Sequence, residues 1–490
     1  MSSVNPGLDP QDRKAASEDR VEVPYRFERS HTTAAVHRDF PDLPKGTSTG
    51  VTVSVAGRLV LSRPQGKLAF ATLRDSTGTI QLFALAGETA DFRGFCDLSL
   101  GEWIGARGEV VTTKRGELSV KVSDWVLLAH SSLGFGDKWR GVTDLETRYR
   151  QREMDLWANP ASRDPFLLRS HMISLIRRWL EDRGFLEVET PMLHGVPSGG
   201  NAHPFVTHHR ALDLDLYLRI APELYLKRLV VGGFEKVFEI GRSFRNEGLS
   251  PRHNPEFTML ELYDAYGDYT DVMVLVEDLV SYLAIELVGT TEIVYQGRPV
   301  DLTPPWRRAG LIELVGERLG EDLGLETPLG RLAEVANEHG VSFEDSWGPG
   351  KLLLEIYEKL VEPELWDPVF VCDYPVEVSP LARDHRDRAG LVERFEVIVV
   401  GRELANAFSE LVDPIEQRKR FEHQMEQRAR GDEEAMTVDE AYLRALELGL
   451  PPTAGLGIGI DRLAMLLADV PNIRDVILFP TMRPDPSMMT

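Results

Sequence analysis

The sequence predicts a multi-domain α+β protein, with a small N-terminal β-barrel followed by a larger domain in which helices surround a mixed or antiparallel sheet. Two observations lead to this prediction. Residues 50–130 alternate apolar and polar side chains at a period of two, as short β-strands do. From residue 166 onward, helical and strand patterns follow one another along the chain. A chain of 490 residues, 42% of them apolar, is long enough for two or three such units.

The composition excludes several kinds of protein. Cys96 and Cys372 are the only cysteines, too few for a disulfide framework or a zinc knuckle, and we interpret both as small core residues. No apolar run approaches the roughly 18 residues of a membrane span, and residues 1–20 contain no apolar segment that resembles a signal peptide. We therefore predict a cytoplasmic protein that has no membrane contact.

The formal net charge of −23 is unevenly distributed along the chain. Residues 1–150 carry 20 basic and 19 acidic side chains, whereas residues 151–490 carry 35 and 59. Nucleic-acid phosphates are bound through Lys and Arg, so strong acidity disfavours such a partner. Because the acidity belongs to the larger part of the chain, net charge neither supports nor excludes nucleic-acid binding.

Four regions are expected along the chain: an N-terminal arm (1–45), a barrel (46–133), a charged linker with short helices (134–165) and a second domain (166–490). In the arm, Pro24, Pro41 and Pro44 are expected to break any regular element. Five strands separated by turns fit an OB-fold, although another small barrel or a sandwich also fits the pattern. The alternating segments are 51–63, 66–75, 79–86, 102–113 and 117–129.

The second domain begins with a helical pattern at residues 166–183, where Leu168, Met172, Ile176 and Leu180 share one face. Neither of the common glycine-rich phosphate-binding loops occurs in the chain. We expect a helical insertion at about 300–360, apolar strands at 236–244, 257–263, 394–400 and 456–460, and helices at 271–287, 351–361, 415–430 and 438–448.

Residues 236–266 are predicted to form a strand, a polar loop and a second strand. Phe238, Ile240 and Phe244 share one face by parity, which leaves Arg245 on the other face. With Arg252 and His253 on the loop, Arg245 would form an electropositive surface that suits a polyphosphate. A solvated hairpin held by salt bridges is the alternative interpretation.

Residues 394–411 are predicted to form a hairpin that turns near Gly401. A two-residue turn would place Glu396 and Glu403 on one face, and paired carboxylates are the hard oxygen ligands that Mg²⁺ prefers. Asn406, Phe408 and Glu410 have the opposite parity from Glu403. All of them can face one pocket only if a β-bulge intervenes.

Residues 455–470 are predicted to form a glycine-rich strand that leads into a helix beginning near Asp461. Glycines allow a ligand to approach the backbone closely, and Arg462 at the helix start would favour an anion. The alternative is that the glycines serve tight strand packing and that Arg462 forms an ion pair.

In this order and joined to the barrel, the three segments resemble class II lysyl-tRNA synthetases. GFLEVETP (184–191) is similar to motif 1 of that family, FRNEGLSPRHNPEF (244–257) to motif 2, and GLGIGIDR (455–462) to motif 3. The resemblance spans residues 24–484, and FRNEG, RHNPEF and GRELANAFSEL distinguish it from aspartyl and asparaginyl relatives. It implies an anticodon-binding OB-fold and a class II catalytic domain on an antiparallel sheet, with motif 1 at about 166–191, motif 2 at about 236–266 and motif 3 at about 455–470.

For the nucleotide, the resemblance implies that Arg245 and Arg462 are catalytic. Arg245 would clamp the α-phosphate and the lysine carboxylate, while His253 and Arg462 hold the outer phosphates. Phe257 would stack on adenine, and Glu396 and Glu403 would bind Mg²⁺. The residues implied for ATP are Arg245, Glu247, His253, Asn254, Phe257, Glu396, Glu403 and Arg462.

For lysine, the resemblance implies that Gly199 and Glu223 read the α-amino group and that Glu410 and Tyr263 take the side-chain ammonium. The residues implied for lysine are Gly199, Glu223, Arg245, Tyr263, Asn406, Phe408 and Glu410. In the barrel, the positions implied for the tRNA(Lys) anticodon are Arg63, Phe70, Gln81 and Glu117. A homodimer is also implied.

The chain departs from the family pattern in three places: a basic helix before the barrel is absent, Asn201 and His203 stand in a glycine-rich stretch, and Ser243 replaces a common asparagine. Two rival functions remain. A paralogue that lysylates a non-tRNA acceptor usually lacks the barrel. An inactive tRNA-binding regulator is expected to have lost at least one of Arg245, Glu396, Glu403 and Arg462, and all four are present.

Overall fold

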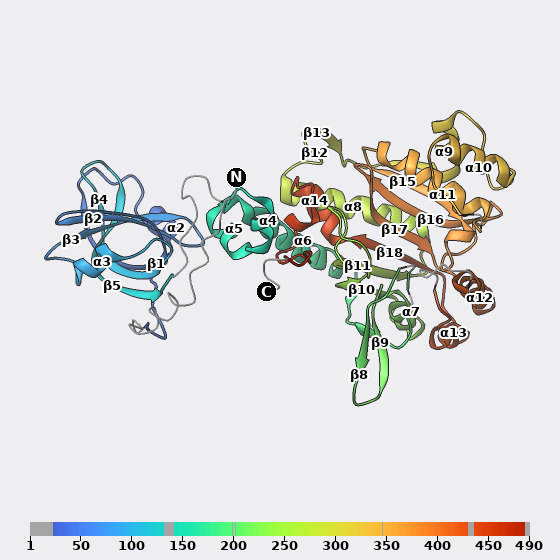
Figure 1. Cartoon of the computed structure of the whole chain (residues 1–490), viewed down its shortest axis with the longest axis horizontal. Coiled ribbons are helices and arrows are strands. Elements are labelled where there is room, and N and C mark those ends of the chain that lie inside the picture. The colour runs from blue at the N-terminus through green and yellow to red at the C-terminus, as the bar shows by residue number, and fades with distance from the viewer. Residues whose placement is uncertain are drawn as a thin grey trace. The chain divides into compact units, whose positions relative to one another are not determined.

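The computed structural model describes residues 23–131, 142–197, 199, 200, 202–344, 346–429 and 436–485. The chain divides into two compact units, residues 1–148 and 149–490 (Figure 1). Residues 1–22 of the expected arm, residues 132–141 at the end of the expected barrel and the start of the expected linker, and Asn201 lie outside the described part of the chain.

The smaller unit is a closed barrel of five strands in the order β1-β2-β3-β5-β4. β3 and β5 pair in parallel, and all other neighbours pair antiparallel. All five strands predicted from the period-two pattern are confirmed, and the barrel is the predicted OB-fold. The strands are β1 (Ser48–Gln65), β2 (Leu68–Arg74), β3 (Thr79–Leu85), β4 (Trp103–Thr112) and β5 (Leu118–Ala129), with α3 (Phe92–Asp97) between β3 and β4.

A short helix, α2 (Thr33–Asp39), belongs to the barrel unit, although no regular element was predicted here. Val36 is fully buried in the barrel core. Thr33 donates hydrogen bonds from its amide and from its hydroxyl to the Asp75 carboxylate, at 2.8 and 2.7 Å. The prediction was wrong because the three prolines flank this helix without interrupting it, and because its main contacts are long-range.

The larger unit is built on an eight-stranded sheet in the order β14-β15-β16-β17-β18-β11-β10-β6. The six inner strands pair antiparallel, and each edge strand pairs in parallel with its neighbour. The strands predicted at 236–244, 257–263, 394–400 and 456–460 are confirmed as β10, β11, β16 and β18. The strands are β6 (Leu186–Glu187), β10 (Lys236–Phe244), β11 (Glu256–Ala265), β14 (Arg307–Gly310), β15 (Val369–Pro375), β16 (Leu391–Val399), β17 (Arg402–Ser409) and β18 (Thr453–Gly459).

The main hydrophobic core joins one face of this sheet to three helices, α6 (Asp164–Glu181), α8 (Tyr269–Val288) and α14 (Ile460–Leu467) (Figure 1). The predicted apolar stripe of α6 faces this core: Met172, Ile176 and Leu180 are fully buried, and Leu168 packs against them. The opposite face of the sheet is therefore the side on which a ligand site can form.

Two further cores lie at the flanks of the sheet. Helices α9 (Leu311–Leu319), α10 (Leu329–Glu338) and α11 (Pro349–Leu360) pack with β15, and α7 (Glu223–Val231) and α13 (Glu440–Glu447) share a core at the other end. No described helix is long and apolar enough to cross a membrane. The remaining elements are α4 (Leu145–Arg150), α5 (Arg152–Ala158), α12 (Pro414–Ala429), the small sheet of β7 (Leu193–His194), β8 (Val206–His209) and β9 (Leu214–Leu218), and the hairpin of β12 (Glu292–Tyr295) and β13 (Arg298–Asp301).

Candidate functional site

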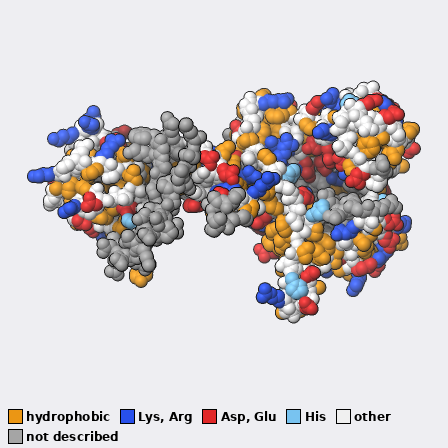
Figure 2. Space-filling model, in the orientation of Figure 1, with side chains coloured by type: hydrophobic (Ala, Val, Ile, Leu, Met, Phe, Trp, Pro, Cys, Tyr) orange, Lys and Arg blue, Asp and Glu red, His pale blue; other side chains and the backbone are white. Residues whose placement is uncertain are grey.

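Strand alternation separates a core face from a cavity face on the central sheet of the larger unit. On β11, Leu260 and Leu262 enter the main core, whereas Met259, Glu261 and Tyr263 line a cavity of about 470 Å³. Figure 2 shows a hollow in the larger unit with acidic side chains gathered in it and basic side chains beside it. The cavity lies on the face of the sheet that the core helices leave uncovered.

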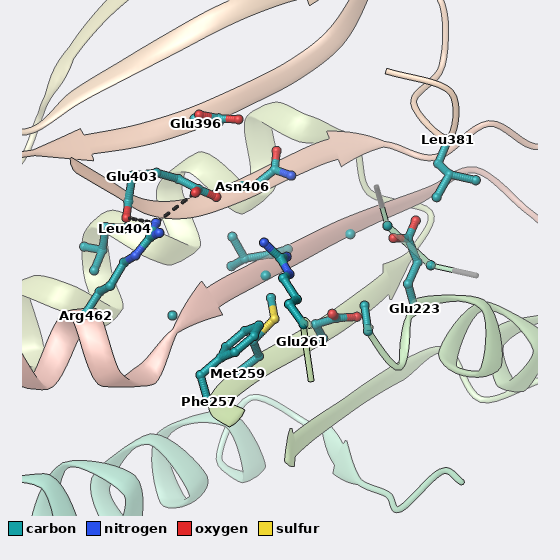
Figure 3. Close-up of a pocket in the computed structure, with 18 of the residues that line it drawn as sticks. Glu223, Phe257, Met259, Glu261, Leu381, Glu396, Glu403, Leu404, Asn406 and Arg462 are labelled. Carbon is teal, nitrogen blue, oxygen red and sulfur yellow. Dashed lines mark hydrogen bonds and ion pairs between the residues drawn. The ribbon is translucent and has the colours of Figure 1, made fainter. Parts of the chain in front are cut away.

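Every residue predicted for ATP, lysine or Mg²⁺ lines this one cavity. They come from segments far apart in the chain, on α7, β11, β16, β17, α14 and the connecting loops (Figure 3). The residues are Gly199, Glu223, Arg245, Glu247, His253, Asn254, Phe257, Tyr263, Glu396, Glu403, Asn406, Phe408, Glu410 and Arg462.

A β-bulge explains how the residues of the β16–β17 hairpin share the cavity. Glu396 pairs with Asn406 across the strands, but Ile398 pairs with Glu403, so Leu404 is an extra residue on β17. The connecting turn is the two-residue Val400–Gly401, both with positive φ, as a type I′ turn requires. The β-bulge that the parity of these residues requires is therefore present in the hairpin.

One end of the cavity is lined by basic groups. Arg462 Nη1 donates hydrogen bonds to Glu403 Oε2 at 2.8 Å and to the Glu403 carbonyl oxygen at 2.7 Å (Figure 3). The Arg245 guanidinium lies 5.2 Å from the Phe257 ring centroid, and among the described residues its Nε has no hydrogen-bond partner. Burial and then the Arg462 charge lower the pKa of His253. This end suits an anionic ligand.

The two paired carboxylates beside this basic end influence each other's ionisation. Burial and the Glu403 charge raise the pKa of Glu396 to about 7. Burial would also raise the pKa of Glu403, but the Arg462 and Arg245 charges hold it below its usual value. Arg394 was not predicted from the sequence. It donates hydrogen bonds to Glu396 at 2.6 Å and to Asn406 at 3.0 Å, and so links the carboxylate pair to the next part of the cavity.

The glycine-rich strand β18 gives room to the cavity residues beside it. A Cβ at Gly455 would overlap the Glu410 carboxylate and lie 2.7 Å from a ring carbon of Tyr263. Only glycine therefore allows these two side chains to lie against the strand. The following helix, α14, begins at Ile460 and places Arg462 in its first turn, as predicted.

The opposite end of the cavity is acidic and buried. Glu223 and Glu410 lie there, and among the described residues Glu410 Oε1 has no hydrogen-bond partner. Glu261 was missed by the sequence argument, although it shares the parity of Tyr263 on β11. Burial and then the Glu223 charge raise the pKa of Glu261 to about 8. Such a site favours ligands with ammonium groups.

Tight backbone packing and hydrogen bonds hold the loops that form the rim of the cavity. Gly199 has a φ of +86°, and a Cβ there would come within 3.2 Å of the Ala221 carbonyl oxygen. The amide of Asn246 donates to the carbonyl oxygen of His203 at 2.8 Å, which ties the glycine-rich stretch to the loop after β10. The Asn254 side chain bonds backbone groups: it donates to Glu256 at 2.6 Å and accepts from Thr481 at 3.1 Å.

In the smaller unit, the residues predicted for an anticodon lie on the outer surface of the barrel. Phe70 pairs with Arg63 on β1 and stacks on Phe83 of β3, with ring centroids 5.3 Å apart. Gln81 accepts a hydrogen bond from Ser119 at 2.8 Å. Phe83 was not predicted, although it follows Gln81 at the same parity. Glu117 is exposed just before β5.

Comparison with known proteins agrees with this arrangement. A family model described as tRNA synthetases class II (D, K and N) matches residues 144–483, and one described as OB-fold nucleic acid binding domain matches residues 53–128. The lysine–tRNA ligase of Prochlorococcus marinus (strain MIT 9313) is 54% identical over 94% of this chain and 93% of the relative.

Two other relatives give the same result. The lysine–tRNA ligase of Synechococcus sp. (strain CC9311) is 54% identical over 96% of this chain and 97% of its own length. That of Carboxydothermus hydrogenoformans is 51% identical over 94% of this chain and 93% of its own length. The chain therefore belongs to the class II tRNA synthetases and, within them, to the lysine–tRNA ligase family.

Proposed function

We propose that this chain activates L-lysine with ATP to form lysyl-adenylate and then transfers lysine to the 3′ end of tRNA(Lys). The observation that carries the proposal is the polarity of one cavity: Arg245 and Arg462 stand at one end, and the buried Glu410 carboxylate stands at the other. Lysine carries a carboxylate at one end and an ammonium at the other, which matches this polarity. Residues 166–490 perform the chemistry, and residues 46–133 bind the anticodon.

The basic end of the cavity performs activation by positioning and charge neutralisation. Arg245 holds the lysine carboxylate beside the α-phosphate of ATP, so that two anionic groups can approach in line. Arg462 and His253 hold the outer phosphates, and Phe257 stacks on adenine beside Glu247 and Asn254. The unpartnered Arg245 Nε and its contact with the Phe257 ring support this arrangement. No protein nucleophile is required.

Glu396 and Glu403 fit a Mg²⁺ site by their donor chemistry. Their like charges disfavour each other's ionisation, and a divalent cation held by these two carboxylates would remove that penalty. No group of three or more acidic, His or Cys side chains in the described ranges forms a metal site by itself. Mg²⁺ is usually held by one or two carboxylates together with substrate phosphates and water. Bound Mg²⁺ would supply further neutralisation of the phosphates.

The acidic end of the cavity reads the amino acid. Glu410 and Tyr263 take the side-chain ammonium, while Gly199 and Glu223 take the α-amino group. Asn406 and Phe408 shape the wall between these groups. Selectivity follows because a ligand without the side-chain ammonium would leave a buried carboxylate unpaired, which costs several kcal/mol. Glu410, with an exposed fraction of 1%, supports this reading.

We also propose a homodimer that works in the cytoplasm. Leu186 of the motif-1 segment and the neighbouring Met192 and Leu193 expose 45–48% of their surface, and a contact between two copies at this segment would cover them. Light scattering should give twice the monomer mass at micromolar concentration. A species of only monomer mass would count against the dimer.

Lysine-dependent ATP–pyrophosphate exchange, followed by charging of purified tRNA(Lys), tests the proposed function. We expect exchange with lysine and little exchange with arginine or ornithine at equal concentration. Exchange without tRNA charging would favour a different acceptor. If lysine supports no exchange at all in the folded protein with Mg²⁺ present, the proposed reaction is wrong.

A further inference from the structure

A fully buried cation, Lys227, stands at the acidic end of the cavity. It lies on α7 one helical turn after Glu223, and its Nζ is 2.7 Å from Glu223 Oε1. The same ammonium contacts Glu410 Oε2. Lys227 and Glu410 are 0% and 1% exposed, so neither charge is compensated by solvent. A buried ammonium is tolerated when carboxylates pair with it, as here.

Lys227 is placed behind the cavity wall. Glu223 and Glu410 line the cavity, whereas Lys227 is absent from its lining. The ammonium also lies 5.3 Å from the Phe408 ring centroid and 5.9 Å from that of Tyr442. The contact engages Oε2 of Glu410, and apart from this ion pair neither carboxylate oxygen of Glu410 has a hydrogen-bond partner among the described residues. Glu223 thus contacts Lys227 through Oε1 and Glu410 contacts it through Oε2, while both side chains also line the cavity.

Several ionisable groups face this pair from each neighbouring element. Burial lowers the pKa of Lys227, but the charges of Glu223 and Glu410 outweigh it and raise the value overall. Burial raises the pKa of Glu410 well above its usual value, and the Lys227 charge is the strongest influence against that rise. Arg219 and Glu239, which act on Glu261, form a separate buried ion pair 2.6 Å apart, and their two charges compensate each other. The facing groups are Glu223 on α7, Glu261 and Tyr263 on β11, and Tyr442 on α13.

We propose that Lys227 is a positioning residue for the ammonium groups of the substrate: from behind the cavity it holds Glu223 and Glu410 ionised and oriented toward the ligand. The inference rests on the proposed lysine specificity. Without this cation, Glu223 and Glu410 would face each other uncompensated in one buried site, and one of the two would be expected to bind a proton. Lys227 lets the site keep its negative charge before lysine arrives, so lysine does not have to displace that proton.

Lys227→Met tests the proposal, because Met has nearly the same length and no charge. In pyrophosphate exchange at pH 7, we expect the KM for lysine to rise roughly 30-fold or more, with the KM for ATP nearly unchanged. In Lys227→Met, Glu410 is expected to carry a proton that it must release before lysine binds. The log KM for lysine should therefore fall more steeply with rising pH in the variant than in the parent between pH 6.5 and 8.5. The matched control is Arg228→Met, which removes the next, exposed cation on α7.

A double-mutant cycle with Glu410→Gln shows whether Lys227 acts through Glu410. If it does, Lys227→Met should raise the lysine KM much less in the Glu410→Gln background than in the parent. Equal effects in both backgrounds, or an unchanged pH dependence in Lys227→Met, would mean a structural role only. Lys227→Gln, which keeps an amide donor without the charge, is expected to reproduce the change in pH dependence.

Two controls separate the possible failures. A parent protein without lysine-dependent exchange would refute the proposed function itself, whereas an active parent with an unaffected Lys227→Met variant would refute only the role of Lys227. Infrared difference spectroscopy between the parent and Glu410→Gln at neutral pH does not depend on the Lys227 variants being folded. An ionised Glu410 contributes no protonated-carboxyl band to that difference, and the presence of the band would overturn the proposal.

Discussion

Arg462 and Glu403 are joined by two hydrogen bonds that share one guanidinium nitrogen: Nη1 lies 2.8 Å from the Glu403 carboxylate and 2.7 Å from its carbonyl oxygen. This contact connects the first turn of α14 to the bulged strand β17. It leaves the Arg462 side chain in the cavity, at the basic end.

Arg462→Ala should therefore impair the use of ATP more than the use of lysine. Removal of one preorganised charged donor usually costs about 100- to 1000-fold in rate, and we expect a loss of that size in kcat/KM for ATP. The KM for lysine should stay within a few-fold, since the acidic end is untouched. Pyrophosphate exchange against each substrate measures both quantities, with Arg444→Ala on the exposed side of α13 as the control. A loss confined to lysine would contradict the assignment.

Phe70→Ala should weaken tRNA charging without affecting amino-acid activation. A base that stacks on an aromatic side chain gains about 1–3 kcal/mol, so the KM for tRNA should rise roughly 5- to 150-fold. Gln81→Ala should act in the same direction, because it removes a hydrogen-bonding group on the neighbouring strand. Lysine-dependent pyrophosphate exchange in the same variants serves as the control. Unchanged tRNA kinetics would remove both residues from the anticodon site.

Asp75 links α2 to the barrel and should make barrel stability depend on pH. Burial would raise its pKa, but hydrogen bonds from Thr33 and Thr77 outweigh that effect and lower it. Because the folded-state pKa of Asp75 lies below the unfolded value of about 3.9, the ionised carboxylate stabilises the fold above about pH 3.9. This stabilisation disappears as the pH falls through the folded-state pKa.

Asp75→Asn should destabilise the barrel by about 2 kcal/mol at pH 7. The difference from the parent should shrink steadily below about pH 4, where Asp75 of the parent also becomes neutral. Calorimetric melting of the full chain measures both values, and Asp97→Asn, an exposed carboxylate of the same unit, is the control. A pH-independent difference would show that the carboxylate charge is not what stabilises this contact.

Period-two and helical patterns predicted most of the fold because they follow local burial. The five barrel strands and β10, β11, β16 and β18 each alternate between a core face and another face, so their patterns are visible in the chain itself. β15 was missed because all seven of its residues are buried and its apolar run does not alternate. Helix α2 was missed because the carboxylate that holds it, Asp75, is 42 residues away from Thr33.

The site was harder to predict where it depends on tertiary contacts. Parity showed that a bulge was needed on the β16–β17 hairpin, but it did not show that Leu404 is the extra residue, because the register depends on the partner strand. Glu223 and Lys227, four residues apart on a helix, have the pattern of an ordinary surface ion pair. Only the packing of β17 and α13 against α7 reveals that this pair is buried.

Glu410→Gln in lysine-dependent pyrophosphate exchange tests the central claim most directly. Gln keeps the shape and one hydrogen bond but removes the charge that we propose for the lysine ammonium. We expect kcat/KM for lysine to fall by roughly 30- to 4000-fold, which corresponds to about 2–5 kcal/mol, while the KM for ATP changes little. Glu447→Gln, an exposed carboxylate on α13, is the control. A folded Glu410→Gln variant whose kcat/KM for lysine stays within about threefold of the parent would contradict the account.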